Sequence, residues 1–224
     1  MTNLPILYSL QHCPYAMRAR IAIFKSALPV RIRAIKLNNK PPEMLALSTD
    51  KTVPMLVIED GQQVPTVIEE SLDIMLYILK QNDPNQLLQP SSEQSLDDNL
   101  TLISEYEQHF LPAVEAYKCA KRYKEPNVES FREHCEVYLQ PLEDKLHQHS
   151  YLTADKEGIV DIALMPFIRQ FSKVERQWFQ QSPYPKLRAW LSHYMQSPMF
   201  TKIMAKHTLW VDCHQDIIFG DIKK

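Results

Sequence analysis

The fold of this chain is decided by the stretch His12-Cys13-Pro14-Tyr15-Ala16-Met17-Arg18. It follows an extended segment, residues 4–9, and begins a helical one. Proline is favoured at the first helical position, because it has no N–H to lose there, so Pro14 places Cys13 at the N-cap. A helix N-terminus carries partial positive charge and unpaired N–H groups, which favour the thiolate, the reactive form of cysteine. The pattern therefore predicts a reactive thiol where the first strand ends.

The neighbours of Cys13 argue against the alternative, a buried and inert core thiol. They are polar and cationic, with His12 before it and Arg18 and Arg20 after it, whereas an interior position would be surrounded by aliphatic residues. The position three residues on is Ala16, so there is no Cys-x-x-Cys pair. A disulfide made by Cys13 must therefore be resolved by a thiol from outside.

On either side of the Cys13 junction, the residue pattern predicts the order β-α-β-(α)-β-β-α for the first part of the chain. The elements expected after the Cys13 helix are a strand over 30–37, a short helix over 43–47, strands over 55–59 and 63–67, and a helix from residue 70. The dipeptide Asp60-Gly61 is a hairpin signal, and Ser71 is the expected N-cap of the last helix.

The remainder of the chain shows a different pattern. Residues 82–92 contain two asparagines and two prolines that break both periodicities, so they are predicted to form a linker. Apolar stripes at helical spacing then recur, and residues 93–224 are predicted to be all helical, with Pro112 and Pro166 kinking their helices. Asp161 is expected to cap one helix, with Gly158 at its N-cap. A catalytic carboxylate is the alternative role of Asp161, and we prefer the cap.

Composition excludes several classes of function. The 224 residues include 25 basic and 27 acidic residues, a net charge of -2, without a basic run, so nucleic acid is not an expected partner. There is neither a signal-peptide pattern nor an apolar run of about 18 residues, so no membrane partner is expected. Four scattered cysteines favour the cytoplasm. The histidine and cysteine spacings predict no metal site, and three glycines are too few for a phosphate-binding loop.

Four features together resemble the glutathione transferase superfamily over nearly the whole chain. They are the Cys-Pro-Tyr-Ala junction at 13–16, the Thr-Val-Pro step at 52–54, the Glu-Ser helix start at 70–71, and the all-helical second half. Cys13, together with Asn39-Lys40-Pro41, looks like the cysteine-type branch, which includes omega-like transferases and their glutaredoxin relatives. The resemblance implies a thioredoxin-like α/β domain over 1–81, a linker over 82–92 and an all-α domain over 93–224, and also a homodimer.

The resemblance also implies that glutathione is the co-substrate. The residues expected to bind it are Pro14, Tyr15, Lys40, Val53, Pro54, Glu70 and Ser71. In a cis turn, Val53 would offer its backbone N–H and C=O to the cysteinyl part of glutathione. The helix start at Ser71 suits the γ-glutamyl carboxylate, Glu70 its ammonium, and Lys40 the glycyl carboxylate, while Tyr15 would pack against the bound thiol. The structural alternatives are that Pro54 only shapes a turn, that Ser71 is only an N-cap, and that Lys40 is only a solvated loop lysine.

These residues lead to three functional hypotheses. In the first, the chain is a glutathione-dependent thiol transferase, which deglutathionylates substrates or reduces dehydroascorbate through a mixed disulfide of Cys13 with glutathione. In the second, it conjugates glutathione to electrophiles with assistance from Tyr8 or Ser9. In the third, it is a binding or regulatory module without catalysis. The co-substrate pocket is expected between the two domains, with Tyr117 and Trp178, placed on the first and third long helices of the second half, as its walls. The natural co-substrate is left open.

Overall fold

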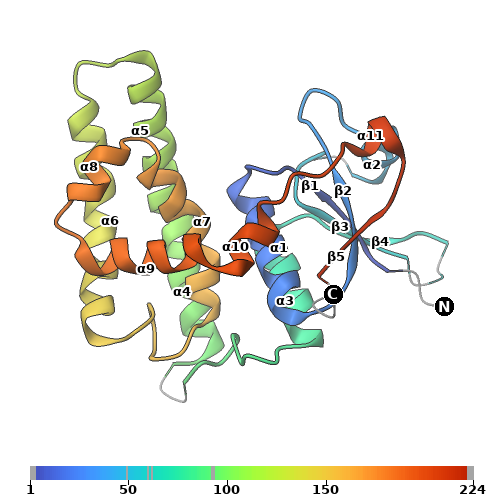
Figure 1. Ribbon diagram of the computed structural model, residues 1–224, viewed down its shortest axis with the longest axis horizontal. Coiled ribbons are helices and arrows are strands. Elements are labelled where there is room, and N and C mark those ends of the chain that lie inside the picture. Colours follow the sequence, from blue (N-terminus) through green and yellow to red (C-terminus); the bar gives the residue numbers. More distant parts are fainter. Residues whose placement is uncertain (1–3, 49, 60, 62, 92–93, 221–224) are drawn as a thin grey trace. The chain divides into compact units, whose positions relative to one another are not determined.

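The computed structural model describes residues 4–48, 50–59, 61, 63–91 and 94–220. The chain forms two compact units. The first comprises residues 1–85 together with 198–224, and the second comprises residues 86–197. In Figure 1 the first unit holds all of the labelled strands, and the second is made of helices.

The first unit is built on a mixed five-stranded sheet. Its strands are β1 (Ile6–Ser9), β2 (Val30–Ala34), β3 (Met55–Ile58), β4 (Thr66–Ile68) and β5 (Ile217–Phe219). Their order is β4-β3-β1-β2-β5, in which β1 and β2 are parallel and the other neighbouring pairs antiparallel (Figure 1). This arrangement confirms the predicted thioredoxin-like α/β fold.

Helices cover both faces of this sheet. Helix α1 (Pro14–Ser26) connects the parallel strands β1 and β2, as a β-α-β unit requires, and it packs against α3 (Ser71–Gln81). On the opposite face, Met44 of the short helix α2 (Pro42–Leu47) joins a buried cluster with Ile6 and Tyr8 of β1 and with Met55 and Val57 of β3. The sheet therefore carries a core on each side, and the C-terminal end of β1 leads directly to Cys13.

The structure corrects two local predictions in this unit, the strand bounds and the cap of α3, and confirms a third, the β3–β4 pairing. The strands predicted over 30–37 and 63–67 are 30–34 and 66–68. The N-cap of α3 is Glu70, which is extended and whose carbonyl oxygen accepts from the Ile74 N–H, so the helix begins one residue before the start that Ser71 as cap would give. The predicted pairing of β3 with β4 is confirmed, although Asp60 of its turn lies outside the described residues.

The prediction that residues 93–224 are all helical is wrong at the C-terminal end. After two short helices, α10 (Pro198–Ile203) and α11 (Trp210–Cys213), the chain forms β5, which pairs with the outer edge of β2. Gly220 follows β5 with φ +93, and a Cβ there would lie 2.5 Å from the Leu28 carbonyl oxygen, so no side chain fits. The C-terminal segment therefore belongs to the first unit.

The second unit is helical, as predicted. Its elements are α4 (Leu96–Glu105), the π-helix Tyr106–Phe110, α5 (Leu111–Tyr123), α6 (Val128–Gln148), α7 (Ile159–Ser172), α8 (Arg176–Gln181) and α9 (Pro185–Gln196). Pro112 lies in the first turn of α5, directly after the π-helix, where its missing N–H costs little, whereas Pro166 lies inside α7. Among the described residues, no helix is both long and apolar enough to cross a bilayer.

Helix α7 begins with the predicted cap. Asp161 is fully buried, and its carboxylate accepts from the backbone N–H of the N-cap residue Gly158 at 3.0 Å. The glycine has a steric reason, because a Cβ at this position would lie 2.9 Å from Cγ of Pro90. Glycine therefore permits close packing here, and Asp161 supplies the half of the capping box that accepts from the N-cap N–H.

Candidate active site around Cys13

Cys13 is the N-cap of α1, as the sequence predicts. Its backbone is extended, Pro14 follows in the first helical turn, and the Met17 N–H donates to the Cys13 carbonyl oxygen at 2.9 Å. The Cys13 N–H donates to the Leu10 carbonyl oxygen at 3.3 Å, which closes the turn between β1 and α1. The thiol makes no capping hydrogen bond and is partly exposed. A partly accessible thiol therefore lies at the positive end of a helix.

The turn before β3 lies beside this thiol. The Val53-Pro54 peptide bond is cis, and the Cys13 Sγ lies 3.9 Å from the Val53 carbonyl oxygen. These two residues are forty positions apart in sequence, and the pairing of β1 with β3 brings them together. The predicted cis turn is thus confirmed, and a backbone edge lies next to the thiol.

Helix α3 is connected to α1 through a buried arginine. Arg18 Nη1 donates to Ser71 Oγ at 3.4 Å, and both residues are buried, whereas Glu70 is exposed. The hydroxyl of Ser71 therefore faces α1 and does not cap its own helix. The first turn of α3 is held against the Cys13 helix by this contact.

The remaining predicted glutathione residues lie in the same unit. Lys40 Nζ donates to the Lys51 carbonyl oxygen at 2.6 Å, which places its charge at the loop that leads to Val53. Tyr15 is exposed over 40% of its surface, two residues after Cys13. Both residues therefore lie on segments that adjoin the Cys13 helix or the Val53 turn.

The two hydroxyls at the end of β1 are already engaged. Tyr8 is buried, and its hydroxyl accepts from Arg33 Nη1 at 2.9 Å. Burial raises the pKa of Tyr8, against the lowering effect of Arg33. Ser9 is also buried, and its hydroxyl accepts from Arg20 Nη1. Tyr8 therefore belongs to the sheet core, and neither hydroxyl is presented as Cys13 is.

Tyr117 and Trp178, the predicted walls of a co-substrate pocket, both pack within the helical unit. Tyr117 of α5 is fully buried, and its hydroxyl donates to Glu175 at 2.5 Å. Trp178 is on the short helix α8, not on a long one, and the Arg132 guanidinium lies 4.6 Å from the centroid of its ring. Tyr117 has no exposed face for a ligand, because it fills the core beside Phe171. The structure thus gives it a packing role.

Sequence reasoning missed the two arginines of α1 as structural residues. The sequence pattern presents Arg18 and Arg20 as cationic surroundings of the thiol, but they are exposed over only 0% and 2% of their surfaces. The signal was present, since two arginines interrupt a helix that is otherwise apolar from Ala16 to Ile23. Long cationic side chains are rarely buried without partners, so such an interruption indicates buried hydrogen bonds.

The described part of the chain contains no group of three or more histidine, cysteine, aspartate or glutamate side chains arranged to hold a metal ion.

The two units together define a class of protein in which a thioredoxin-like domain precedes a helical domain. Residues 7–86 match the glutathione S-transferase N-terminal domain, and residues 96–198 match the glutathione S-transferase C-terminal domain. These two matches span most of the chain. The chain belongs to the glutathione S-transferase family of enzymes.

Individual relatives are distant. The chain is 25% identical over 199 residues to pyrimidodiazepine synthase of Drosophila melanogaster, covering 86% of this chain and 77% of that protein. It is 25% identical over 191 residues to glutaredoxin 2 of Escherichia coli K12, covering 75% of this chain and 85% of that protein. Among solved structures, glutathione transferase Omega 3C from Trametes versicolor matches with a TM-score of 0.76 at 16% identity, covering 96% and 90%. The curated proteins similar to this chain thus include a glutaredoxin, and the solved structures with the same fold include an omega-type transferase.

Proposed function

We propose that this enzyme is a glutathione-dependent thiol transferase in which Cys13 is the nucleophile. The observation that carries the proposal is the state of the Cys13 thiol, which is partly exposed at a helix N-terminus and free of any capping hydrogen bond. A thiolate is favoured at such a position and attacks disulfides. The similarity to a glutaredoxin supports the same chemistry.

The reaction has two exchanges. In the first, the Cys13 thiolate attacks the glutathione sulfur of a glutathionylated substrate, a new S–S bond forms, and the substrate leaves as a thiolate that takes a proton from water. In the second, the thiolate of another glutathione attacks the glutathione sulfur held on Cys13. Glutathione disulfide forms and the Cys13 thiolate is released. In balance, one glutathionylated substrate and one glutathione give one reduced substrate and one glutathione disulfide, and Cys13 is regenerated.

The proposed glutathione site uses the segments around the thiol. The backbone of Val53 would pair with the cysteinyl part, as an added strand does, while cis Pro54 sets the turn. The N-terminus of α3 at Ser71 would receive the γ-glutamyl carboxylate, and Glu70 its ammonium. Lys40 would exchange its bond to the Lys51 carbonyl oxygen for the glycyl carboxylate.

Two neighbours complete the proposed site. Pro14 fixes the start of α1, and Tyr15 would cover the bound sulfur. A homodimer and a cytoplasmic location are also part of the proposal, on the strength of the family resemblance and of the sparse cysteines.

Conjugation with Tyr8 or Ser9 as the activating hydroxyl is the second candidate, since the family includes such enzymes. The structure offers it less support. The Tyr8 hydroxyl accepts from Arg33 in the sheet core, and the Ser9 hydroxyl accepts from Arg20. Activation of a thiolate requires a hydroxyl that can reach it and donate to it, and both residues are buried, whereas the Cys13 thiol is partly exposed.

The test is the intact mass of the reduced protein after incubation with glutathione disulfide. Wild type is expected to gain one glutathione adduct that added glutathione removes, and Cys13→Ser is expected to gain none at this position. Cys119→Ser is the matched control, because Cys119 is an exposed thiol on α5. An adduct that survives in Cys13→Ser and disappears in Cys119→Ser, or full conjugating activity of Cys13→Ser, would disprove the proposal.

A further inference from the structure

A cavity of about 610 Å³ opens in the first unit next to the Cys13 turn. Residues 9–12, which lead into Cys13, form one wall; residues 34–36 at the end of β2 form a second; and residues 205–209 of the C-terminal segment form a third. Because β1 and β2 are parallel, their C-terminal ends meet at one edge of the sheet, where ligands bind in open α/β sheets. Its volume is that of a small-molecule site.

Arg20 ties two of these walls together. Its guanidinium donates to the Gln11 carbonyl oxygen at 2.7 Å on the side of the Cys13 turn, and to the Ile203 carbonyl oxygen at 2.7 Å on the side of the C-terminal segment. The Gln11 side chain donates in turn to the Met204 carbonyl oxygen at 2.9 Å. The turn that positions Cys13 is therefore fixed to the C-terminal segment by buried and partly buried hydrogen bonds.

The rest of the C-terminal segment is also held in place. Leu209 forms a bridge with Ala34 at the end of β2, and the Trp210 ring lies under the Arg33 guanidinium at 3.7 Å. The Trp210 indole N–H donates to Glu43, and β5 then pairs with β2. The cavity is thus enclosed by anchored backbone, so a ligand does not have to order its walls.

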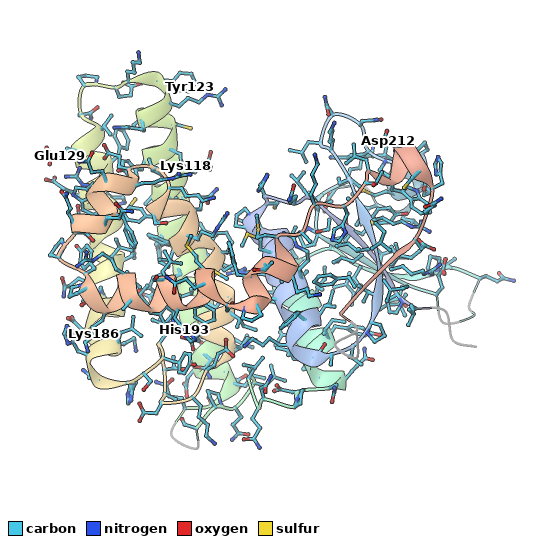
Figure 2. The ribbon with its side chains drawn as sticks, in the orientation of Figure 1. Lys118, Tyr123, Glu129, Lys186, His193 and Asp212 are labelled. Carbon is cyan, nitrogen blue, oxygen red and sulfur yellow. The ribbon has the colours of Figure 1, made fainter. Side chains whose placement is uncertain are left out.

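The cavity is cationic although the chain as a whole has a net charge of -2. Arg20, Lys36 and Lys206 line it, against one carboxylate, Asp212, which lies on α11 (Figure 2). Arg20 uses its donors on backbone oxygens, but Lys36 and Lys206 are exposed and have no ion-pair partner among the described residues. Burial, with the charge of Arg20, lowers the pKa of His207, so this side chain adds no positive charge at neutral pH.

We propose that this cavity binds the carboxylates of the second glutathione, the one whose thiolate attacks the mixed disulfide on Cys13. The inference rests on the proposed function and names the site of its second exchange. Lys36 and Lys206 would hold the carboxylates, while the turn at 10–12 directs the attacking thiolate toward the glutathione sulfur on Cys13. The S–S bond to Cys13 then breaks and glutathione disulfide leaves. The carboxylate of Asp212 would repel the carboxylates of this glutathione.

The test loads Cys13 with glutathione and measures the rate at which a second thiol removes it. Two thiols are compared, glutathione, which is anionic, and 2-mercaptoethanol, which is neutral. In Lys206→Glu the ratio of the glutathione rate to the 2-mercaptoethanol rate is expected to fall about five- to tenfold at low ionic strength. The reason is that a negative charge in the cavity slows the arrival of an anionic thiol but not that of a neutral one. Asp212→Asn is expected to raise the ratio.

Lys202→Glu is the matched control. Lys202 is exposed on α10, four residues earlier in the same segment, and it does not line the cavity, so the net charge changes equally. An equal fall of the ratio in Lys202→Glu, or no fall in Lys206→Glu, would overturn the proposal. Lys36→Glu repeats the test from the second wall.

A separate measurement distinguishes failure of this site from failure of the proposed function. The reduced, unloaded protein is alkylated at Cys13 with iodoacetate, which carries a carboxylate, and with iodoacetamide, which does not. The quantity compared is the ratio of the iodoacetate rate to the iodoacetamide rate. If this ratio falls in Lys206→Glu and not in Lys202→Glu, it supports an anion site whether or not a mixed disulfide forms. An unchanged ratio overturns the site while leaving the disulfide chemistry of Cys13 intact. Failure to form any mixed disulfide would overturn the proposed function and the assignment of its second glutathione.

Discussion

The helices α1 and α7 begin with opposite solutions to the same problem, the unpaired N–H groups of a first turn. At α1 the N-cap is Cys13, whose thiol makes no capping bond and is partly exposed. At α7 the N-cap is Gly158, and the fully buried Asp161 accepts from its N–H. Asp161 also accepts from the Leu152 N–H and from the indole N–H of Trp190, both at 2.9 Å.

The difference separates a helix start used for folding from one used for chemistry. A satisfied helix N-terminus has no positive end left for a ligand or a nucleophile, whereas an unsatisfied one can favour a thiolate. In this chain α7 thus has a closed start and α1 an open one. Substitutions at the two positions should affect different quantities: stability at Asp161 and thiol chemistry at Cys13.

The largest stability effect is expected from Asp161→Ala. The change leaves three donors without their acceptor, including two backbone N–H groups and the indole of Trp190, in a buried place. Such losses cost about 3–5 kcal/mol in total. Urea unfolding measures the loss, and the rate of Cys13 glutathionylation per folded molecule is expected to stay at the wild-type level.

Asp98→Ala is the control for this prediction. Asp98 forms the same kind of capping box, with Ser95 at the start of α4, but it is exposed to solvent. Water can replace its bonds, so the loss of stability is expected to be clearly smaller than at Asp161. Equal losses at the two aspartates would show that burial does not set the cost.

The second prediction concerns pH. Burial raises the pKa of Asp161 from its ordinary 3.8 to about 7, although its three N–H donors act in the opposite direction. Between these values the native state holds a proton that the unfolded state has lost. The free energy of unfolding contributed by Asp161 is therefore complete below about pH 4 and falls as the pH rises through 7, by at most about 1.4 kcal/mol per pH unit.

Asp161→Asn provides the comparison for this pH dependence, since its side chain does not titrate. Urea unfolding from pH 4 to pH 8 is expected to show wild type losing stability relative to Asp161→Asn. A wild type whose stability relative to Asp161→Asn stays constant over this range would mean that the N–H donors keep the carboxylate ionised in the folded protein.

The predicted parts of the fold and site depend on local signals. Pro14 places the N-cap at Cys13 by its own chemistry, and Asp161 three residues after Gly158 identifies a cap from spacing alone. The Val53-Pro54 turn is likewise a dipeptide property, although the expectation of a cis bond came from the family resemblance. These features require no knowledge of distant residues.

The missed parts depend on partners far along the chain. The run Ile217-Ile218-Phe219 is too short to show a period, and it forms a strand because the edge of β2 is available to it. Arg20 is buried because Ile203 brings a carbonyl oxygen to it across 183 residues. The cavity beside Cys13 arises from both features, so the sequence could predict the thiol and not the second site next to it.

The smallest predicted effect is a gain of stability in Cys13→Ser. Serine is a preferred N-cap, and its hydroxyl can accept from the N–H of Tyr15 or Ala16, which the thiol leaves uncapped. The expected gain is about 0.5–1 kcal/mol in urea unfolding, and Cys13→Ala, which has no acceptor, should show none. Equal stability of the two variants would mean that the start of α1 is already satisfied in another way. A gain accompanied by loss of the glutathione adduct would show that the open helix start is retained for its chemistry at a cost in stability.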